Sequence, residues 1–249
     1  MRTKKTTPYL YMLPGCAMVL VFVYIPVIAN CVYSFFRLSS YSAGMKFVGL
    51  DNYIRFFHNE SLGIMLRNNL LYCVISLIVQ VGFGTVIALL LESKLASSRF
   101  RNAFRNIYYI PALISLTAVG LMFTFIYEPN LGLLNSAFKA LGLTSMTQSW
   151  LGDSKIAIYC IIAMSQWQYT GYITLLMVVA FQNVSPDYIE AASIDGAGPV
   201  RRAISVVLPL AKEQLLVCSI ITVIGAFKLF TEVYSTTAGG PGNSTQVLG

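Results

Sequence analysis

The sequence predicts an all-α membrane protein, a polytopic bundle of spanning helices that forms one transmembrane domain over residues 1–249. Two observations predict this class. Hydrophobic residues make up 56% of the chain and charged residues only 11%, less than half of the roughly 25% that an ordinary soluble domain carries. The apolar residues also gather in uncharged runs about as long as a bilayer requires. Much of the surface must therefore face lipid.

The first expected span covers residues 8–36. Arg2, Lys4 and Lys5 precede it, and no further charge appears until Arg37. A secretory signal peptide also begins with basic residues, but its apolar core has only about 7–15 residues. This run is roughly twice that length, so we expect it to be retained as a membrane helix.

Three further spans are expected at residues 69–91, 107–127 and 156–181, none of which contains a charge. The second has only Gln80 as a strongly polar interior residue, and the third has Pro111 near its start. The fourth is long enough to cross a bilayer with a tilt.

A fifth span, 210–235, is less regular. Only fourteen uncharged residues separate Glu213 from Lys228, whereas a span needs about 20. The segment can cross only if Lys228, with Glu232, lies within or at the edge of the membrane, facing protein or water. The two residues are four apart and could pair on one helical face. Membrane charges are candidates for function, and a structural salt bridge to another subunit is the alternative.

The charges in the connections predict the orientation. Lys94, Arg99, Arg101 and Arg105 follow the second span, and basic connections favour the cytoplasm. We therefore expect a cytoplasmic N-terminus, with residues 37–68 and 128–155 outside and residues 182–210 inside. The outer 37–68 connection fits this rule least well, because it carries Arg37, Lys46, Arg55 and Arg67.

Several classes of protein are disfavoured. The net charge of +7 comes from basic blocks beside apolar runs, so no nucleic-acid partner is expected. Neither the cysteines nor the one histidine, which lies in a polar loop, predict a disulfide framework or a metal site; we expect the cysteines to be small buried hydrophobes. These residues are His58, Cys16, Cys31, Cys73, Cys160 and Cys218.

Residues 185–209 predict a compact pair of helices in the second cytoplasmic connection. Ser185 can cap a helix whose first position suits Pro186 and whose positive end suits Asp187. Gly196 permits a turn and Pro199 can begin a second short helix, while Pro209 marks the bend into the fifth span. A solvated connection without a special function is the alternative.

This loop also carries a resemblance. Glu190-Ala191-Ala192, three residues, Gly196, nine residues and then Val206-x-Leu208-Pro209 resembles the EAA signature of ATP-binding-cassette importer permeases, with Val206 where Ile is usual. Three further stretches are similar to the carbohydrate-type branch of that family, which includes permeases like those for maltose, lactose and glycerol phosphate. They are residues 105–111 (RNIYYIP), 132–135 (GLLN) and 239–241 (GGP).

The resemblance implies a permease subunit that forms the path for a sugar or related solute in a bacterial or archaeal inner membrane. It implies a second, different permease subunit, two cytoplasmic ATPase subunits and an extracytoplasmic solute-binding protein. The chain itself would be no enzyme and bind no cofactor, since it has no Gly-Lys dipeptide for a phosphate-binding loop; ATP and Mg would bind to the partner. The residues carried over as ATPase-coupling residues are Glu190, Ala191, Ala192, Asp195, Gly196 and Pro209.

That branch normally has a sixth span after the Gly-Gly-Pro stretch. Here little follows Gly239, Gly240 and Pro241, and the stretch is too rich in Gly and Pro to be helical. We therefore expect five spans, with the sixth missing because the sequence is truncated.

A polar and aromatic cluster in the fourth span is a candidate for the solute path. Aromatic faces suit sugar rings, and amides and hydroxyls suit sugar hydroxyls. Hydrogen bonding between helices is the alternative. The candidates are Gln166, Trp167, Gln168, Tyr169 and Thr170, together with Lys228 and Glu232.

Two other functions compete with this interpretation. A secondary transporter or channel would have no ATPase partner, and it would normally need acidic groups in the membrane, for which Glu232 is the one candidate. A membrane-embedded enzyme would need a catalytic motif, and neither His-Glu-x-x-His nor Gly-x-Ser-x-Gly occurs.

Overall fold

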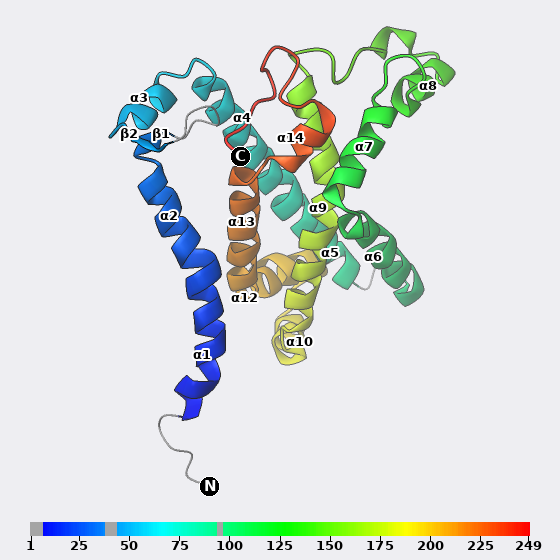
Figure 1. Cartoon of the computed structure of the whole chain (residues 1–249). Helices are drawn as coiled ribbons and strands as arrows, with labels where there is room; N and C mark the ends of the chain where they lie inside the picture. Colours follow the sequence, from blue (N-terminus) through cyan, green and yellow to red (C-terminus); the bar gives the residue numbers. More distant parts are fainter. Residues whose placement is uncertain (1–6, 38–43, 94–96) are drawn as a thin grey trace. The chain divides into compact units, whose positions relative to one another are not determined.

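The chain is represented by a computed structural model that describes residues 7–37, 44–93 and 97–249. It consists of helices and one two-stranded sheet (Figure 1), and it divides into two units, Met1–Leu62 and Gly63–Gly249. Arg2, Lys4, Lys5 and Lys94, on which the orientation argument partly depends, lie outside the described residues.

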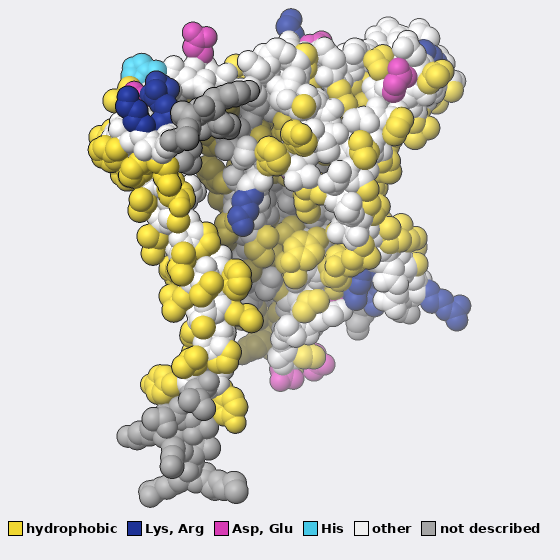
Figure 2. All heavy atoms as spheres, viewed as in Figure 1, with side chains coloured by type: hydrophobic (Ala, Val, Ile, Leu, Met, Phe, Trp, Pro, Cys, Tyr) yellow, Lys and Arg dark blue, Asp and Glu magenta, His cyan; other side chains and the backbone are white. Residues whose placement is uncertain are grey.

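The first unit contains a long apolar helix and a small capping structure. Its helix is continuous over Tyr11–Tyr33 and has no buried residue within the chain, and hydrophobic side chains cover the visible face of this helix (Figure 2). Cys16 and Cys31 are exposed on it, so the expectation of buried cysteines is wrong for these two. The elements are α1 (Thr7–Val19), a π-helical turn (Leu20–Tyr24), α2 (Ile25–Tyr33), β1 (Phe36–Arg37), β2 (Lys46–Phe47) and α3 (Asp51–Phe57).

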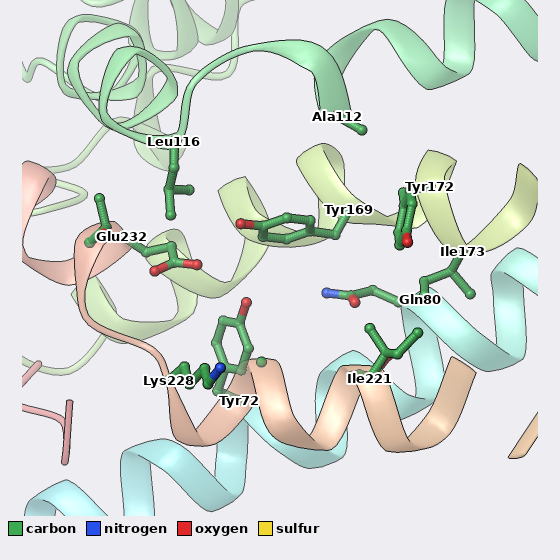
Figure 3. A pocket seen from close by; sticks show the side chains of 13 residues that line it. Tyr72, Gln80, Ala112, Leu116, Tyr169, Tyr172, Ile173, Ile221, Lys228 and Glu232 are labelled. Atoms are coloured by element: carbon green, nitrogen blue, oxygen red, sulfur yellow. The ribbon is translucent and has the colours of Figure 1, made fainter. Parts of the chain in front are cut away.

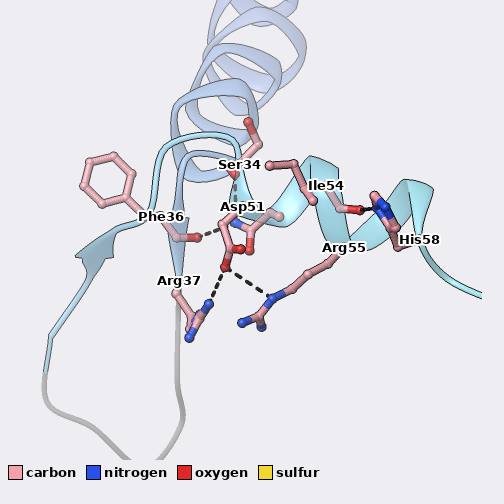
Figure 4. A network of polar contacts seen from close by, with 8 residues as sticks. Ser34, Phe36, Arg37, Asp51, Ile54, Arg55 and His58 are labelled. Carbon is pink, nitrogen blue, oxygen red and sulfur yellow. Dashed lines mark hydrogen bonds and ion pairs between the residues drawn. The ribbon is translucent and has the colours of Figure 1, made fainter.

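Polar contacts fold the segment after α2 back on itself (Figure 4). The Asn52 side-chain amide donates to the carbonyls of Ser34 and Phe36, at 2.8 and 3.0 Å. The Asp51 carboxylate accepts from Arg37 at 2.5 Å and pairs with Arg55 at 3.2 Å. Two of the four basic residues that fit the orientation rule least well are therefore paired with an acid.

The second unit contains the remaining helices. Its elements are α4 (Leu62–Ser76), a π-helical segment (Leu77–Phe83), α5 (Gly84–Glu92), α6 (Ser98–Leu113), α7 (Leu116–Ile126), α8 (Leu133–Ala140), a 3-10 turn (Thr144–Met146), α9 (Ala157–Gln182), α10 (Pro186–Ile194), α11 (Pro199–Arg202), a π-helical turn (Ala203–Val207), α12 (Leu208–Leu210), α13 (Lys212–Phe227) and α14 (Thr231–Thr236).

Helix α9 forms the centre of this unit. It packs against α5, α6, α7, α13 and α14, and its buried side chains belong to both hydrophobic clusters of the core, for example Ile161 in one and Met177 in the other. Gly171 lets α6 approach closely, because a Cβ atom there would lie 2.0 Å from the Tyr108 carbonyl oxygen. Close packing on a small residue is a common device in membrane bundles.

The expected span 107–127 is two helices rather than one. Helices α6 and α7 meet at an angle of 97°, with Ile114 and Ser115 extended between them and the Ser115 hydroxyl accepting from the Ala118 amide at 3.3 Å. The freed Ile114 carbonyl accepts from the Gln168 amide of α9 at 3.1 Å. A break at membrane depth is tolerated when a neighbouring helix satisfies the exposed backbone group in this way.

The expected span 210–235 is also interrupted. Helix α13 ends at Phe227 and α14 begins at Thr231. The Asn69 side chain donates to the Ala226 carbonyl at 2.7 Å, and Leu229 is fully buried in the core between the two helices. These tertiary contacts end the helix, a result that the hydropathy of the segment did not predict. At its other end, α13 meets residues Pro199–Leu210 at an angle of 70°.

By length and composition, two helices among the described residues could cross a membrane, Tyr11–Tyr33 and Leu62–Glu92, or up to four if each bent pair is one span. Helix α9 has 26 residues and no charge, but the polar residues in its middle keep it out of this group. The fold is thus that of a mostly helical membrane protein with breaks.

Candidate functional site

A cavity of about 400 Å³ lies in the second unit among the ends of several broken helices. This volume falls in the range of small-molecule sites, roughly 300–1,000 Å³. Its wall combines aromatic rings with amide, hydroxyl and charged groups (Figure 3). The polar and aromatic side chains that line it include Tyr72, Gln80, Tyr169, Tyr172, Lys228 and Glu232.

The polar and aromatic groups of the cavity wall come from α9, α4 and the π-helical segment after α4, among other elements. Tyr169 and Tyr172 are three apart on α9 and so share one face of that helix. Tyr72 comes from α4, and its hydroxyl lies 2.5 Å from the Ser165 hydroxyl of α9. Gln80 lies in the π-helical segment after α4, and π-helical segments are frequent at functional sites. Among the described residues the Gln80 amide has no side-chain partner within hydrogen-bonding distance, so it is free to bind a ligand.

Of the seven residues expected in the solute path, the cavity wall contains Tyr169, Lys228 and Glu232. The Gln166 amide instead donates to the Ser76 hydroxyl and the Gln168 amide to the Ile114 carbonyl, each at 3.1 Å. For these two glutamines, the hydrogen bonding between helices that we gave as the alternative is what the structure contains. Thr170 donates to a carbonyl of its own helix, and Trp167 packs on Phe123.

Lys228 and Glu232 do not share one helical face as expected. Lys228 caps the end of α13, whereas Glu232 lies in the first turn of α14. The ion pairs found among the described residues do not include this pair. Both side chains face the cavity (Figure 3), which agrees with the expectation that they face protein or water.

Sequence reasoning missed Tyr72, Tyr172 and Thr222 as parts of the cavity wall. Gln80 carried a signal, as the one strongly polar residue inside a long apolar run. Tyr172 could have been found from its spacing to Tyr169. Tyr72 and Thr222 lie in apolar runs and carried no local signal, because only the packing of α4 and α13 against α9 brings them to the cavity.

The loop 185–209 is a second candidate site. The Ser185 hydroxyl accepts from the Asp187 amide at 3.3 Å, α10 begins at Pro186, and α11 begins at Pro199, so the predicted helix pair is confirmed. The bend lies at Ala211, two residues after Pro209. Gly196 has a φ of 78°, a conformation that favours glycine.

Two hydrogen bonds that the sequence did not predict lie within this loop. Arg202 of α11 donates to the Ser193 hydroxyl of α10, and Ser193 in turn donates to the Ile189 carbonyl at 2.7 Å. The coupling candidates Glu190, Ala191, Asp195, Gly196 and Pro209 are exposed, and Ala192 is half-buried. Ile194 is 87% exposed. The loop therefore presents an exposed surface with an apolar side chain, Ile194, on it.

Residues 62–249 match the family model described as the binding-protein-dependent transport system inner membrane component, and this match coincides with the second unit. The probable ABC transporter permease protein YurN of Bacillus subtilis (strain 168) is 41% identical over 98% of this chain and 83% of its own length. The chain belongs to this inner membrane permease family.

Membership in this permease family makes the chain a multi-pass membrane subunit of an ABC importer. The family is not catalytic, and ATP is bound and hydrolysed by a separate subunit. Another relative, the arabinooligosaccharides transport system permease protein AraP of Bacillus subtilis (strain 168), is 33% identical over 93% of this chain and 72% of its own length.

A solved structure has the same fold. One chain of the crystal structure of a bacterial alginate ABC transporter, in complex with an alginate pentasaccharide-bound periplasmic protein, matches 95% of this chain and 77% of its own length with a TM-score of 0.80. Its sequence is 21% identical. The broken helices around the cavity therefore belong to a known permease fold.

Proposed function

We propose that this subunit forms one wall of the path by which a sugar or oligosaccharide crosses the membrane. The cavity lined by Tyr169, Tyr172 and Gln80 is the observation that carries this proposal. Aromatic rings offer broad apolar faces on which the C–H face of a sugar ring can rest, and the amide can both donate to and accept from hydroxyl groups. The name of AraP supports the same solute class.

The proposal includes a solute-binding protein outside, which the family description supports, together with cytoplasmic ATPase subunits and a second, different permease subunit. The N-terminus lies in the cytoplasm, and the loop 185–209 docks on the ATPase. Its exposed Ile194 and the carboxylate of Glu190 supply an apolar contact and a charge for a basic group. Stiffness from the Arg202–Ser193 contact lets the loop pass on motion rather than absorb it.

Uptake into proteoliposomes tests the path. The assembled importer, with its binding protein, is supplied with labelled saccharides of one to four units built on arabinose, galactose or glucose. We expect ATP-dependent uptake of at least one of them. Uptake that follows a proton or sodium gradient and ignores ATP would favour the secondary-transporter alternative instead.

Two tyrosines of α9 provide a matched pair for the same assay. Tyr169→Ala removes a ring from the cavity wall, whereas Tyr159→Ala removes an exposed ring of the same helix that does not line the cavity. We expect Tyr169→Ala to lower uptake at limiting solute about tenfold, a loss of about 1.4 kcal/mol, and Tyr159→Ala to change it less than about twofold. Equal effects would contradict the assignment of this cavity to the path.

Gly196 tests the coupling loop. An added Cβ atom there would meet nothing within 4 Å, but the positive φ disfavours other side chains. Asn adopts this backbone region far more readily than Val. We therefore expect Gly196→Val to abolish uptake while membrane insertion stays intact, and Gly196→Asn to retain a measurable part of the uptake.

Co-purification of the ATPase reports docking directly, and it should be lost with Glu190→Gln but not with Asp187→Asn.

A further inference from the structure

The break between α13 and α14 brings two opposite charges to one cavity. Lys228 ends α13, and Glu232 lies one turn into α14. Both line the cavity, and the Glu232 carboxylate and the Tyr72 and Tyr169 hydroxyls point into the same space (Figure 3). An unbroken helix over residues 210–235 would have set the two charges on one face, within reach of each other.

Among the described residues, neither charge has an ion-pair partner. Other polar groups of the cavity wall are buried and are also free to bind a ligand. Gln80 is 4% exposed and Thr222 is 5% exposed, and within the described part of the chain the Thr222 hydroxyl has no hydrogen-bond partner. Buried polar groups without partners are costly, so the wall as a whole favours an occupant with several hydroxyl groups.

The two charges differ in burial. Glu232 is 6% exposed, whereas Lys228 is exposed on this subunit. Two charges interact roughly four times as strongly at the effective dielectric constant of about 20 found in proteins as they do in bulk water. Dissolved ions weaken the effect of the more exposed charge further. When the Glu232 carboxyl is ionised, it therefore sets the field inside the cavity more than Lys228 does, and that field is negative.

We propose that Glu232 is the charge-selecting residue of this path, one that admits neutral saccharides and excludes saccharides that carry a carboxylate, such as uronic acids. This inference rests on the proposed function of the cavity. A carboxylate only accepts hydrogen bonds, so it suits a pair of donating sugar hydroxyls and repels a second carboxylate. Lys228, which is less buried, makes a smaller contribution of opposite sign.

Charged thiol reagents measure this field without knowledge of the solute. Cys16 and Cys31, the exposed cysteines, are replaced by Ser, and Ala112→Cys places a thiol in the cavity wall on α6, away from both charges in the sequence. The assembled importer is treated with a cationic reagent, trimethylammonioethyl methanethiosulfonate, or an anionic one, sulfonatoethyl methanethiosulfonate. The modification rate of each reagent is divided by its rate of reaction with 2-mercaptoethanol in solution, and the value for the protein without Ala112→Cys is subtracted. The corrected ratio is the value for the cationic reagent divided by that for the anionic one.

We expect the cationic reagent to react at least tenfold faster by this corrected ratio. Glu232→Gln should lower the ratio at least fivefold, Glu232→Asp should preserve it because the charge is kept, and Lys228→Gln should raise it less than about twofold. A ratio of one or below, or a ratio that follows Lys228 more than Glu232, overturns the proposal. Where Glu232→Gln does not assemble, the wild-type ratio and the Lys228→Gln variant still decide it.

The failure of the proposed function has a different signature. If the cavity is not a saccharide path, Tyr169→Ala and Tyr159→Ala affect saccharide uptake equally, yet the reagent ratio still reports the sign of the field. If the path is correct and the charge selection is wrong, neutral uptake is normal and the ratio is insensitive to Glu232. Under the proposal, maltose at millimolar concentration slows modification of Ala112→Cys more than glucuronate does, and Glu232→Gln reduces that difference.

Discussion

The loop 185–209 and the cavity are both polar regions of one membrane subunit, but different contacts hold them. In the loop, the Ser185 cap and the Arg202–Ser193 contact join residues no more than nine apart in the sequence. In the cavity, the Tyr72–Ser165 contact joins residues 93 apart, and the Asn69–Ala226 contact joins residues 157 apart. The loop is local structure, whereas the cavity exists only after distant helices have packed.

This difference predicts that single substitutions behave differently in the two regions. Removing a local contact loosens one turn, because the rest of the turn still forms. Removing a contact between helices opens the packed core, whose neighbouring groups cannot find other partners in lipid. Three experiments, in order of expected effect, test this contrast.

The largest effect is expected at the α6–α9 contact. Gly171→Ala would place a Cβ atom 2.0 Å from the Tyr108 carbonyl oxygen, and because that atom belongs to the backbone, α6 must move. We expect folded protein to be lost, measured as the monodisperse fraction in mild detergent by size-exclusion chromatography. Gly225→Ala is the matched control, since its Cβ atom would meet nothing within 4 Å, and it should leave that fraction unchanged or increase it. Similar behaviour of the two variants would refute the close approach.

An intermediate effect is expected at Asn69. Its amide donates to the Ala226 carbonyl at 2.7 Å, and its carbonyl oxygen accepts from the Leu248 amide at 2.9 Å. Asn69→Asp keeps the shape but replaces the donor with an oxygen beside a carbonyl. We expect a loss of about 1–3 kcal/mol of stability, seen as a lower midpoint of thermal unfolding in detergent. Asn183→Asp, at an exposed position, should lower that midpoint by far less, and an equal shift would contradict the role of Asn69.

The smallest effect is expected at Glu128, another local contact. Backbone N–H donors of Leu131 and Asn130 hold the pKa of the Glu128 carboxyl below its ordinary value. Because the folded-state pKa is lowered, this stabilisation is present above the unfolded-state pKa and is lost as the pH falls through the folded-state value. We expect protection of the amides of residues 130–132 from hydrogen exchange, corrected for intrinsic rates, to fall in that window.

The Glu128→Gln variant should lack this pH dependence, with no change in the midpoint of global unfolding. A wild-type loop whose corrected protection stays constant over the same acid range would show that the carboxylate does not hold it. A shift in global unfolding would show that this contact is not local.

The same contrast explains which parts of the site could be predicted. The helix cap and the two helix starts of the loop could be predicted from Ser185, Pro186 and Pro199, because each of these residues affects only its nearest neighbours in the chain. The polar cluster of the fourth span was recognised as a group, but its members were not separated by function. Which of Gln166, Gln168 and Tyr169 faces a cavity depends on the helices packed around α9, and only Tyr169 does.

The sequence by itself determined the membrane class, the family and the helix pair of the loop 185–209, because hydropathy, spacing and capping are properties of short stretches of chain. Only the tertiary structure decided where the helices break and which groups line the cavity. The break after Phe227 needs Asn69 at the Ala226 carbonyl and a buried Leu229, and the break at Ile114 needs Gln168 from α9. In a bilayer an interrupted helix is stable only where another segment satisfies the freed backbone groups, so the position of each break is a property of the packed bundle.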